Sequence, residues 1–116
     1  MLNPLTGQTK IIDFGNARPY GNGTLEAGSF GSDAFNPPEW SSRATTTTRD
    51  TDSAIVYTLG CLAFITLTGT CPFGLDEPFD YQQSVLLNSE LQVDEIKFLR
   101  LLLEPDPARR CKLIDL

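Results

Sequence analysis

Apolar residues along this 116-residue chain gather in three blocks at helical spacing, and stretches rich in glycine, proline and polar residues separate them. The longest block, residues 54–67, is apolar nearly all round, which predicts a helix buried on most sides. Asp52 and Ser53 offer N-cap chemistry before this block, and Gly69 stands where it should end. Residues 81–87 carry a weaker pattern that predicts a shorter second helix.

The block at residues 92–104 predicts a third helix. Ile96, Leu99 and Leu103 fall on one face at helical spacing. Acidic residues occupy its first turn, where the helix dipole favours them, and two prolines, at positions 105 and 107, terminate it. Residues 112–116 can start a further helix.

The remaining segments predict little regular structure. Residues 9–12 are β-branched and apolar and predict a short strand, which Met1 and Leu2 would pair with as the tail of a second strand. Residues 15–36 show no sustained period and predict a long loop. Residues 37–40 predict a short helix, and residues 45–48 a polar surface loop. The expected fold is therefore mainly α, with a short N-terminal strand pair, in one small domain.

Composition narrows the classes of function. The net charge is −6 and the basic residues form no large cluster, which argues against a nucleic-acid partner. The chain has no histidine, which excludes a histidine base or metal ligand. Its three cysteines are widely spaced, which predicts neither zinc nor disulfides but a reducing compartment: the cytoplasm, with the nucleus as alternative. We expect no signal peptide and no membrane span, since residues 54–67 are too short and too interrupted.

The tripeptide Asp13-Phe14-Gly15 follows the apolar pair at positions 11 and 12. A carboxylate at the end of a short strand can hold Mg²⁺ against phosphate oxygens, because Mg²⁺ prefers hard oxygen ligands. The following glycine lets the backbone turn sharply beside the metal. Taken alone, the tripeptide favours an ordinary turn, and only the segments that follow it reverse that interpretation.

In order and spacing, these segments resemble the C-terminal lobe of a eukaryotic protein kinase. The resemblance covers nearly the whole chain and is greatest to the Pim-like Ser/Thr kinases. It implies that Asp13 holds Mg²⁺, that Phe14 packs to set active or inactive states, and that Gly15 completes this ATP-side motif. The motifs that carry it, besides that tripeptide, are Pro37-Pro38-Glu39-Trp40, the helix around Gly60, Gly69-Thr70-Cys71-Pro72-Phe73, and residues 105–110.

The resemblance also assigns roles in the middle of the chain. Ser32, Pro37, Pro38 and Glu39 would belong to the end of the activation segment, with Ser32 where Ser/Thr kinases carry a hydroxyl that meets the catalytic Asp. Glu39 would form an ion pair with Arg110, because an Arg fork binds a carboxylate bidentately. That pair would clamp the segment to the helical body without taking part in the chemistry.

One departure concerns the central helix. Most kinases carry there an Asp that holds the catalytic loop, and this chain has Ile55 instead, as the Pim kinases also lack that Asp. The Gly-rich loop, the early-strand Lys and the catalytic loop of the family have no counterpart in these residues, and the last would precede Met1. We therefore expect an incomplete kinase domain over residues 1–116.

Three functional hypotheses follow. The first is a Ser/Thr protein kinase represented by an incomplete chain, which uses ATP and Mg²⁺ as a complete domain but binds neither alone and is inactive alone. The second is a non-catalytic pseudokinase fragment that binds a partner protein. The third is a truncated gene copy without a stable product. Partners would be a protein substrate or a binding protein, and association through exposed apolar helix surface is expected at Ile55, Leu62 and Phe64.

Overall fold

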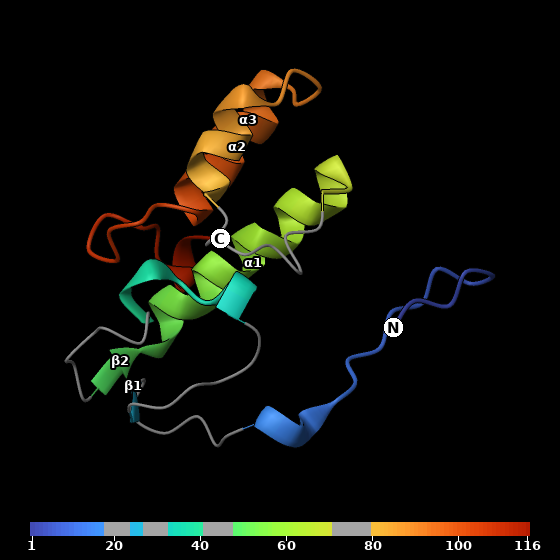
Figure 1. Ribbon diagram of the computed structural model, residues 1–116. Coiled ribbons are helices and arrows are strands. Elements are labelled where there is room, and N and C mark those ends of the chain that lie inside the picture. Colours follow the sequence, from blue (N-terminus) through green and yellow to red (C-terminus); the bar gives the residue numbers. More distant parts are fainter. Residues whose placement is uncertain (18–23, 27–32, 41–47, 71–79) are drawn as a thin grey trace.

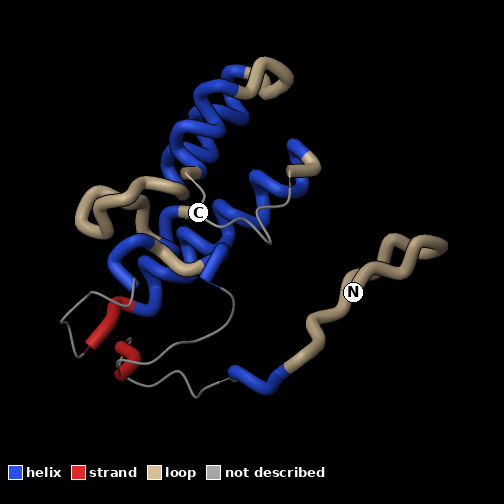
Figure 2. Tube along the Cα trace, in the orientation of Figure 1, coloured by secondary structure: helices blue, strands red, loops and turns tan. Residues whose placement is uncertain are grey.

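The computed structural model describes residues 1–17, 24–26, 33–40, 48–70 and 80–116. These residues are mainly helical (Figures 1 and 2). The α-helices are α1 (Thr51–Thr68), α2 (Tyr81–Leu87) and α3 (Val93–Leu102). Short 3-10 turns occupy Phe14–Asn16, Asp33–Phe35, Pro38–Trp40 and Leu113–Asp115.

Helix α1 is the central element, and α2 and α3 pack against it. It begins three residues before the predicted start and ends at Thr68, where Gly69 takes a left-handed φ of 68° and donates its N–H to the Ile65 carbonyl at 2.8 Å. The expectation that α1 is buried on most sides is wrong. Because its described neighbours cover one face, the exposed fraction is 37% for Ile55 and 49% for Leu62.

Among the described helices, α1 is the one that is long and apolar enough to cross a membrane. That criterion rests on length and composition only. The buried share of the 18-residue span is 39%, and a core helix of a soluble protein has the same character.

The two shorter helices owe their starts to side chains. The Asp80 carboxylate caps α2 by accepting the Gln83 N–H at 2.9 Å. The Glu95 carboxylate turns back to accept the Gln92 N–H at 2.7 Å at the start of α3. Helix α3 ends at Leu102, two residues before the predicted end, because Pro105 cannot donate to an extended ladder.

The core lies between α1, α2 and α3. The predicted apolar face of α3 is confirmed: Leu99 and Leu103 are fully buried, and Ile96 packs against the core. Gly60 allows the close approach of α1 to α3, because a Cβ at that position would lie 2.8 Å from the Leu102 Cβ. The buried cluster consists of Tyr57, Cys61, Phe64, Tyr81, Val85, Leu91, Leu99 and Leu103.

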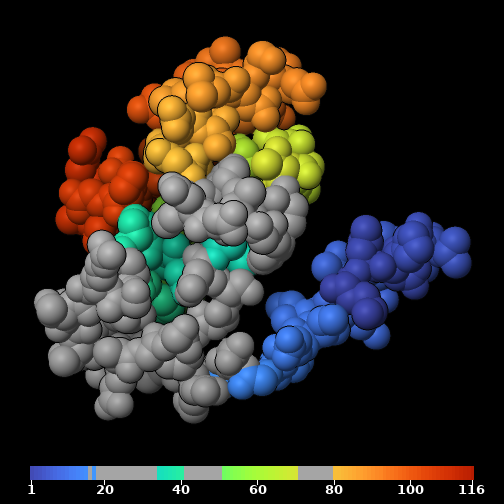
Figure 3. Space-filling model, in the orientation of Figure 1, coloured from blue at the N-terminus to red at the C-terminus, as the bar shows by residue number. Residues whose placement is uncertain are grey.

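The N-terminal residues form an arm that extends away from the helical body (Figures 1 and 3). The predicted strand pair is reduced there to a single antiparallel bridge between Leu2 and Thr9. The Asn3 side chain accepts the Leu5 N–H at 3.0 Å and closes the turn between them. Residues 10–12 are exposed and form no strand, because nothing among the described residues covers their apolar side chains.

Two further differences concern the loops. The strands β1 (Thr24–Glu26) and β2 (Thr48–Asp50) form a short antiparallel pair in regions where the sequence predicted only loop. At three residues each, they are too short for an alternating pattern to reveal. The predicted short helix near residues 37–40 is a 3-10 turn, and the predicted last helix is reduced to the turn Leu113–Asp115.

Candidate functional site

Residues 33–40 form a segment that lies against α1, which we call the anchored segment (Figure 1). Two short 3-10 turns shape it, and the N–H of Trp40 donates to the Pro37 carbonyl at 2.8 Å within the second. Pro37 is fully buried and Phe35 packs against the core, whereas Pro38 is exposed. The segment is thus held by packing near its middle and by polar contacts toward both ends.

Arg110 holds one end of the anchored segment. Its side chain is completely buried, and that of Glu39 is 24% exposed. The Arg110 guanidinium donates to both Glu39 carboxylate oxygens, from NH1 at 2.7 Å and from NH2 at 3.0 Å. This is the bidentate geometry of a strong charge-assisted pair. The structure therefore brings together the two residues that the kinase resemblance paired, across 71 positions of sequence.

The other Arg110 contacts satisfy the rest of the guanidinium. Its NH1 donates at 2.9 Å to both the carbonyl and the hydroxyl of Ser53, in the first turn of α1. Its Nε donates to the Glu104 carbonyl at 2.8 Å, and NH2 donates to the Pro105 carbonyl at 3.3 Å. A buried charge is tolerable only when it is paired and hydrogen-bonded in this way.

Tyr57 lies beneath this cluster. The Arg110 Cζ is 4.9 Å from the centroid of the Tyr57 ring, which is a cation–π distance. Burial raises the pKa of the Tyr57 hydroxyl above its ordinary value, nearby Cys61 adds to the rise, and the positive charge of Arg110 opposes it. Burial also raises the pKa of the Cys61 thiol to about 12, against a side-chain hydrogen bond with Tyr81 that favours the thiolate. Both groups are therefore neutral at physiological pH.

Asp13, Phe14 and Gly15 lie in the N-terminal arm. Asp13 has a left-handed backbone, with φ 63° and ψ 74°, and its Oδ1 accepts the Gly15 N–H at 3.4 Å as the cap of the turn Phe14–Asn16. A left-handed conformation is uncommon for a residue other than glycine, and Asp is among those that tolerate it. Phe14 is 69% exposed. The turn Phe14–Asn16 lies in the N-terminal arm, away from the helical body that α1, α2 and α3 form (Figure 1).

Asp13 alone does not make a magnesium site. The described residues contain no group of three or more acidic, Cys or His side chains that could hold a metal ion. A single exposed carboxylate fits one position of an octahedral Mg²⁺ shell, and phosphate oxygens and water would have to supply the others. Asp13 is thus compatible with the role of one metal ligand and insufficient for more.

Ser32 lies outside the described residues. The structure adds three residues that the sequence reasoning did not single out: Ser53 as an Arg110 partner, and Thr58 and Tyr81 as donors to the anchored segment. Ser53 was interpreted only as a helix cap. No local pattern marks a hydroxyl whose acceptor is 47 positions away, as with Tyr81 and Ala34.

The geometry agrees with a comparison of the whole sequence. The sequence matches the family model of the protein kinase domain over residues 1–115. The chain belongs to the protein kinase family. No curated protein and no solved structure matches it. Members of the family generally use ATP and Mg²⁺, and the match favours a kinase-like function without separating the Pim-like group from others.

Proposed function

We propose that this chain is the C-terminal-lobe part of a Ser/Thr protein kinase domain of the Pim-like type. The complete domain would transfer the γ-phosphoryl group of ATP to a Ser or Thr hydroxyl of a protein. The bond from the γ-phosphorus to the ADP oxygen breaks, a bond to the substrate oxygen forms, and the hydroxyl proton is released. The observation that carries the proposal is the buried Glu39–Arg110 pair, within a chain whose sequence matches the kinase domain.

The chemistry of each proposed group follows from its position. Asp13 would supply one oxygen ligand to Mg²⁺, and the anchored segment, with Ser32 just before it, would lie along the protein substrate. Phosphoryl transfer depends on several positioned groups acting together. Because these 116 residues offer one of them, we propose that the polypeptide alone does not transfer phosphate.

The experiment compares the 116-residue polypeptide with the natural product of its gene, each with radiolabelled ATP, Mg²⁺ and separate peptides that contain Ser, Thr or Tyr as the single hydroxyl residue. We expect labelled peptide from the natural product, at least about 100-fold less after Asp13→Asn, and none from the polypeptide alone. Asp94→Asn is a matched control, because it makes the same chemical change at a carboxylate whose side chain is 94% exposed, in the first turn of α3. Label on tyrosine peptides only would contradict the proposed specificity, and transfer by the polypeptide alone would contradict its inactivity.

A second candidate is a non-catalytic pseudokinase fragment that binds a partner protein. The observation that favours it is the row of Ile55, Leu59 and Leu62 on the exposed side of α1, with exposed fractions of 37%, 41% and 49%. Phe64, which the sequence placed in the same surface, is 1% exposed and belongs to the core. A partner with a complementary apolar surface would bind there.

The test of the second candidate is partner capture from cell extract followed by reconstitution with the purified partner. Leu62→Glu should weaken such a complex at least 10-fold, whereas Leu86→Glu, at a leucine of α2 that is 57% exposed, should not. Equal binding by both variants would contradict the assigned surface. A cytoplasmic location and the absence of nucleic-acid and membrane partners stay predictions.

A further inference from the structure

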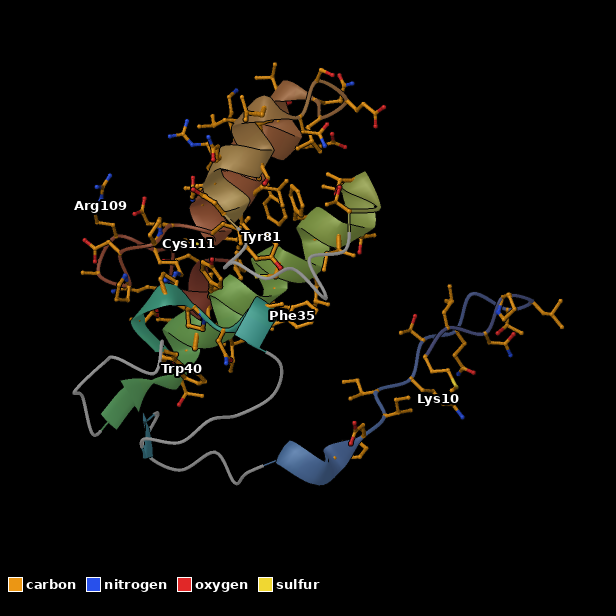
Figure 4. The ribbon with its side chains drawn as sticks, in the orientation of Figure 1. Lys10, Phe35, Trp40, Tyr81, Arg109 and Cys111 are labelled. Atoms are coloured by element: carbon orange, nitrogen blue, oxygen red, sulfur yellow. The ribbon has the colours of Figure 1, made fainter. Side chains whose placement is uncertain are left out.

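Two consecutive backbone carbonyls of the anchored segment accept hydrogen bonds from two different helices. The Tyr81 hydroxyl, at the start of α2, donates to the Ala34 carbonyl at 2.9 Å. The Thr58 hydroxyl, in α1, donates to the Phe35 carbonyl at 3.2 Å. Both carbonyls belong to the turn Asp33–Phe35, directly after Ser32. In Figure 4, Tyr81 and Phe35 are labelled beside α1.

The two hydroxyls are not equal as anchors. The Thr58 oxygen also lies 3.0 Å from the Ala54 carbonyl, the usual acceptor for a helical threonine, so its one proton is shared between two acceptors. The Tyr81 hydroxyl donates to the Ala34 carbonyl over the shorter distance, 2.9 Å against 3.2 Å for Thr58 and Phe35. Tyr81 is therefore the stronger anchor and Thr58 supports it.

The Tyr81 ring has little freedom to move. It is 3% exposed and meets the rings of Tyr57 and Phe64 edge to face, with centroids 6.2 Å and 5.5 Å away. Such geometry is the favourable one for aromatic pairs. Tyr57 also lies under the Arg110 guanidinium. One aromatic cluster therefore supports both the Tyr81 hydrogen bond at one end of the anchored segment and the Glu39–Arg110 ion pair at the other.

We infer that Tyr81, supported by Thr58, is a positioning residue that fixes the backbone of the turn Asp33–Phe35 and thereby the position of the protein substrate. The inference rests on the proposed function, in which this segment lies along the substrate. Tyr81 acts through the backbone of the segment and contacts neither ATP nor the reacting oxygen. Losing its hydroxyl should therefore weaken peptide binding more than it slows the chemical step.

The first test needs no catalytic activity. Tyr81→Phe keeps the ring and removes the donor, and amide hydrogen exchange of residues 33–40 is followed in the 116-residue chain by mass spectrometry. The net contribution of one neutral hydrogen bond to stability corresponds to roughly a 2- to 12-fold change in the equilibrium constant for local opening. Amide exchange in residues 33–40 should therefore accelerate by that factor, while exchange in α3 stays unchanged. Unchanged exchange in residues 33–40 would overturn the anchoring.

Threonine variants supply the matched controls. Thr58→Val should accelerate exchange in the segment by a smaller factor than Tyr81→Phe, and Thr58→Ser should restore the original rate. Thr66→Val is the control, because the Thr66 hydroxyl donates at 2.7 Å to the Leu62 carbonyl within α1 and is exposed. An equal effect of Thr58→Val and Thr66→Val would show that only α1 itself has been loosened, against the inference.

The second test uses the phosphotransfer activity of the natural gene product. Tyr81→Phe should raise the peptide KM several-fold and leave the KM for ATP and kcat within about twofold. A fall in kcat with the peptide KM unchanged would overturn the role in substrate positioning. An unmodified gene product that transfers no phosphate would overturn the proposed function and the substrate part of the inference, whereas the exchange rates would still decide whether Tyr81 anchors the segment.

Discussion

Replacing Arg110 by alanine should cost this protein a large share of its stability. The guanidinium is completely buried and contacts three parts of the chain: Glu39 in the anchored segment, Ser53 in α1, and the turn that begins at Glu104. Its removal leaves the Glu39 carboxylate and several buried carbonyls without their donor.

The magnitude follows from the two partners. Removing one member of a buried pair typically costs about 3–5 kcal/mol, because the other is left uncompensated. The Glu39 carboxylate is 24% exposed and can recover some hydration, so Arg110→Ala should cost about 3 kcal/mol. Glu39→Ala should cost about 4 kcal/mol, because it leaves a positive charge in a fully buried site. The double variant should cost less than the sum, with a coupling energy of about 2–3 kcal/mol.

Urea unfolding measures these costs, followed by circular dichroism and by the fluorescence of Trp40, the one tryptophan of the chain. Arg109→Ala is the matched control. Its side chain is 74% exposed, lies 3.9 Å from the Glu104 carboxylate and is labelled at the periphery of the molecule in Figure 4, so its loss should cost at most about 0.5 kcal/mol. An Arg110→Ala cost within a few tenths of the Arg109→Ala cost would refute the reasoning.

Three other predictions concern the helices and the core, and the same urea assay checks each. Gly60→Ala should destabilise by about 1–3 kcal/mol despite the better helix propensity of alanine, because the new Cβ would lie 2.8 Å from the Leu102 Cβ; a gain in stability would contradict this packing. Asp80→Ala should cost about 0.5–2 kcal/mol by removing the cap on the Gln83 N–H, and an unchanged midpoint would show that the cap is dispensable. The third prediction concerns pH. The Cys61 thiol has a higher pKa in the folded protein, about 12, than in the unfolded chain, 9.0. Its contribution to the free energy of unfolding is therefore complete below pH 9.0 and is lost as the pH rises toward 12. Unfolding free energy should therefore fall across that window by up to about 4 kcal/mol from Cys61, and Cys61→Ala should reduce the fall and leave the part that belongs to Tyr57, whose pKa burial also raises; an equally steep fall in the variant would assign it to other groups.

The sequence predicted the helices well because their signals are local. The apolar face of α3, its acidic first turn and the prolines after it all lie within residues 92–107. The burial of α1 was overestimated because a local signal reports how apolar a helix is. It does not report how many other elements of the fold cover that helix. Ile55 and Leu62 are exposed because the described elements pack on the opposite face.

Within the candidate site, the one contact that we expected is the Glu39–Arg110 ion pair, because a pattern of the kinase family predicts it. The pairing of Glu39 with Arg110 came from the kinase resemblance, since nothing in the spacing of 71 positions indicates it. Tyr81, Thr58 and Ser53 had no such pattern, and their partners are set by how α1 and α2 cross the anchored segment. Hydroxyl-to-carbonyl contacts of this kind leave no trace in composition, because any residue supplies the carbonyl.

The sequence separation between Glu39 and Arg110 also affects how the chain folds during its synthesis on the ribosome. Arg110 is synthesised 71 residues after Glu39, which takes about 4–14 s at ordinary rates of translation. During that interval α1 can already be complete, while the carboxylate of Glu39 and the ring of Tyr57 still lack the guanidinium. The nascent chain therefore passes through a stage in which helices are formed and the anchored segment is loose. A substitution that delays the closing contact would lengthen the time during which chaperones and proteases can act on it.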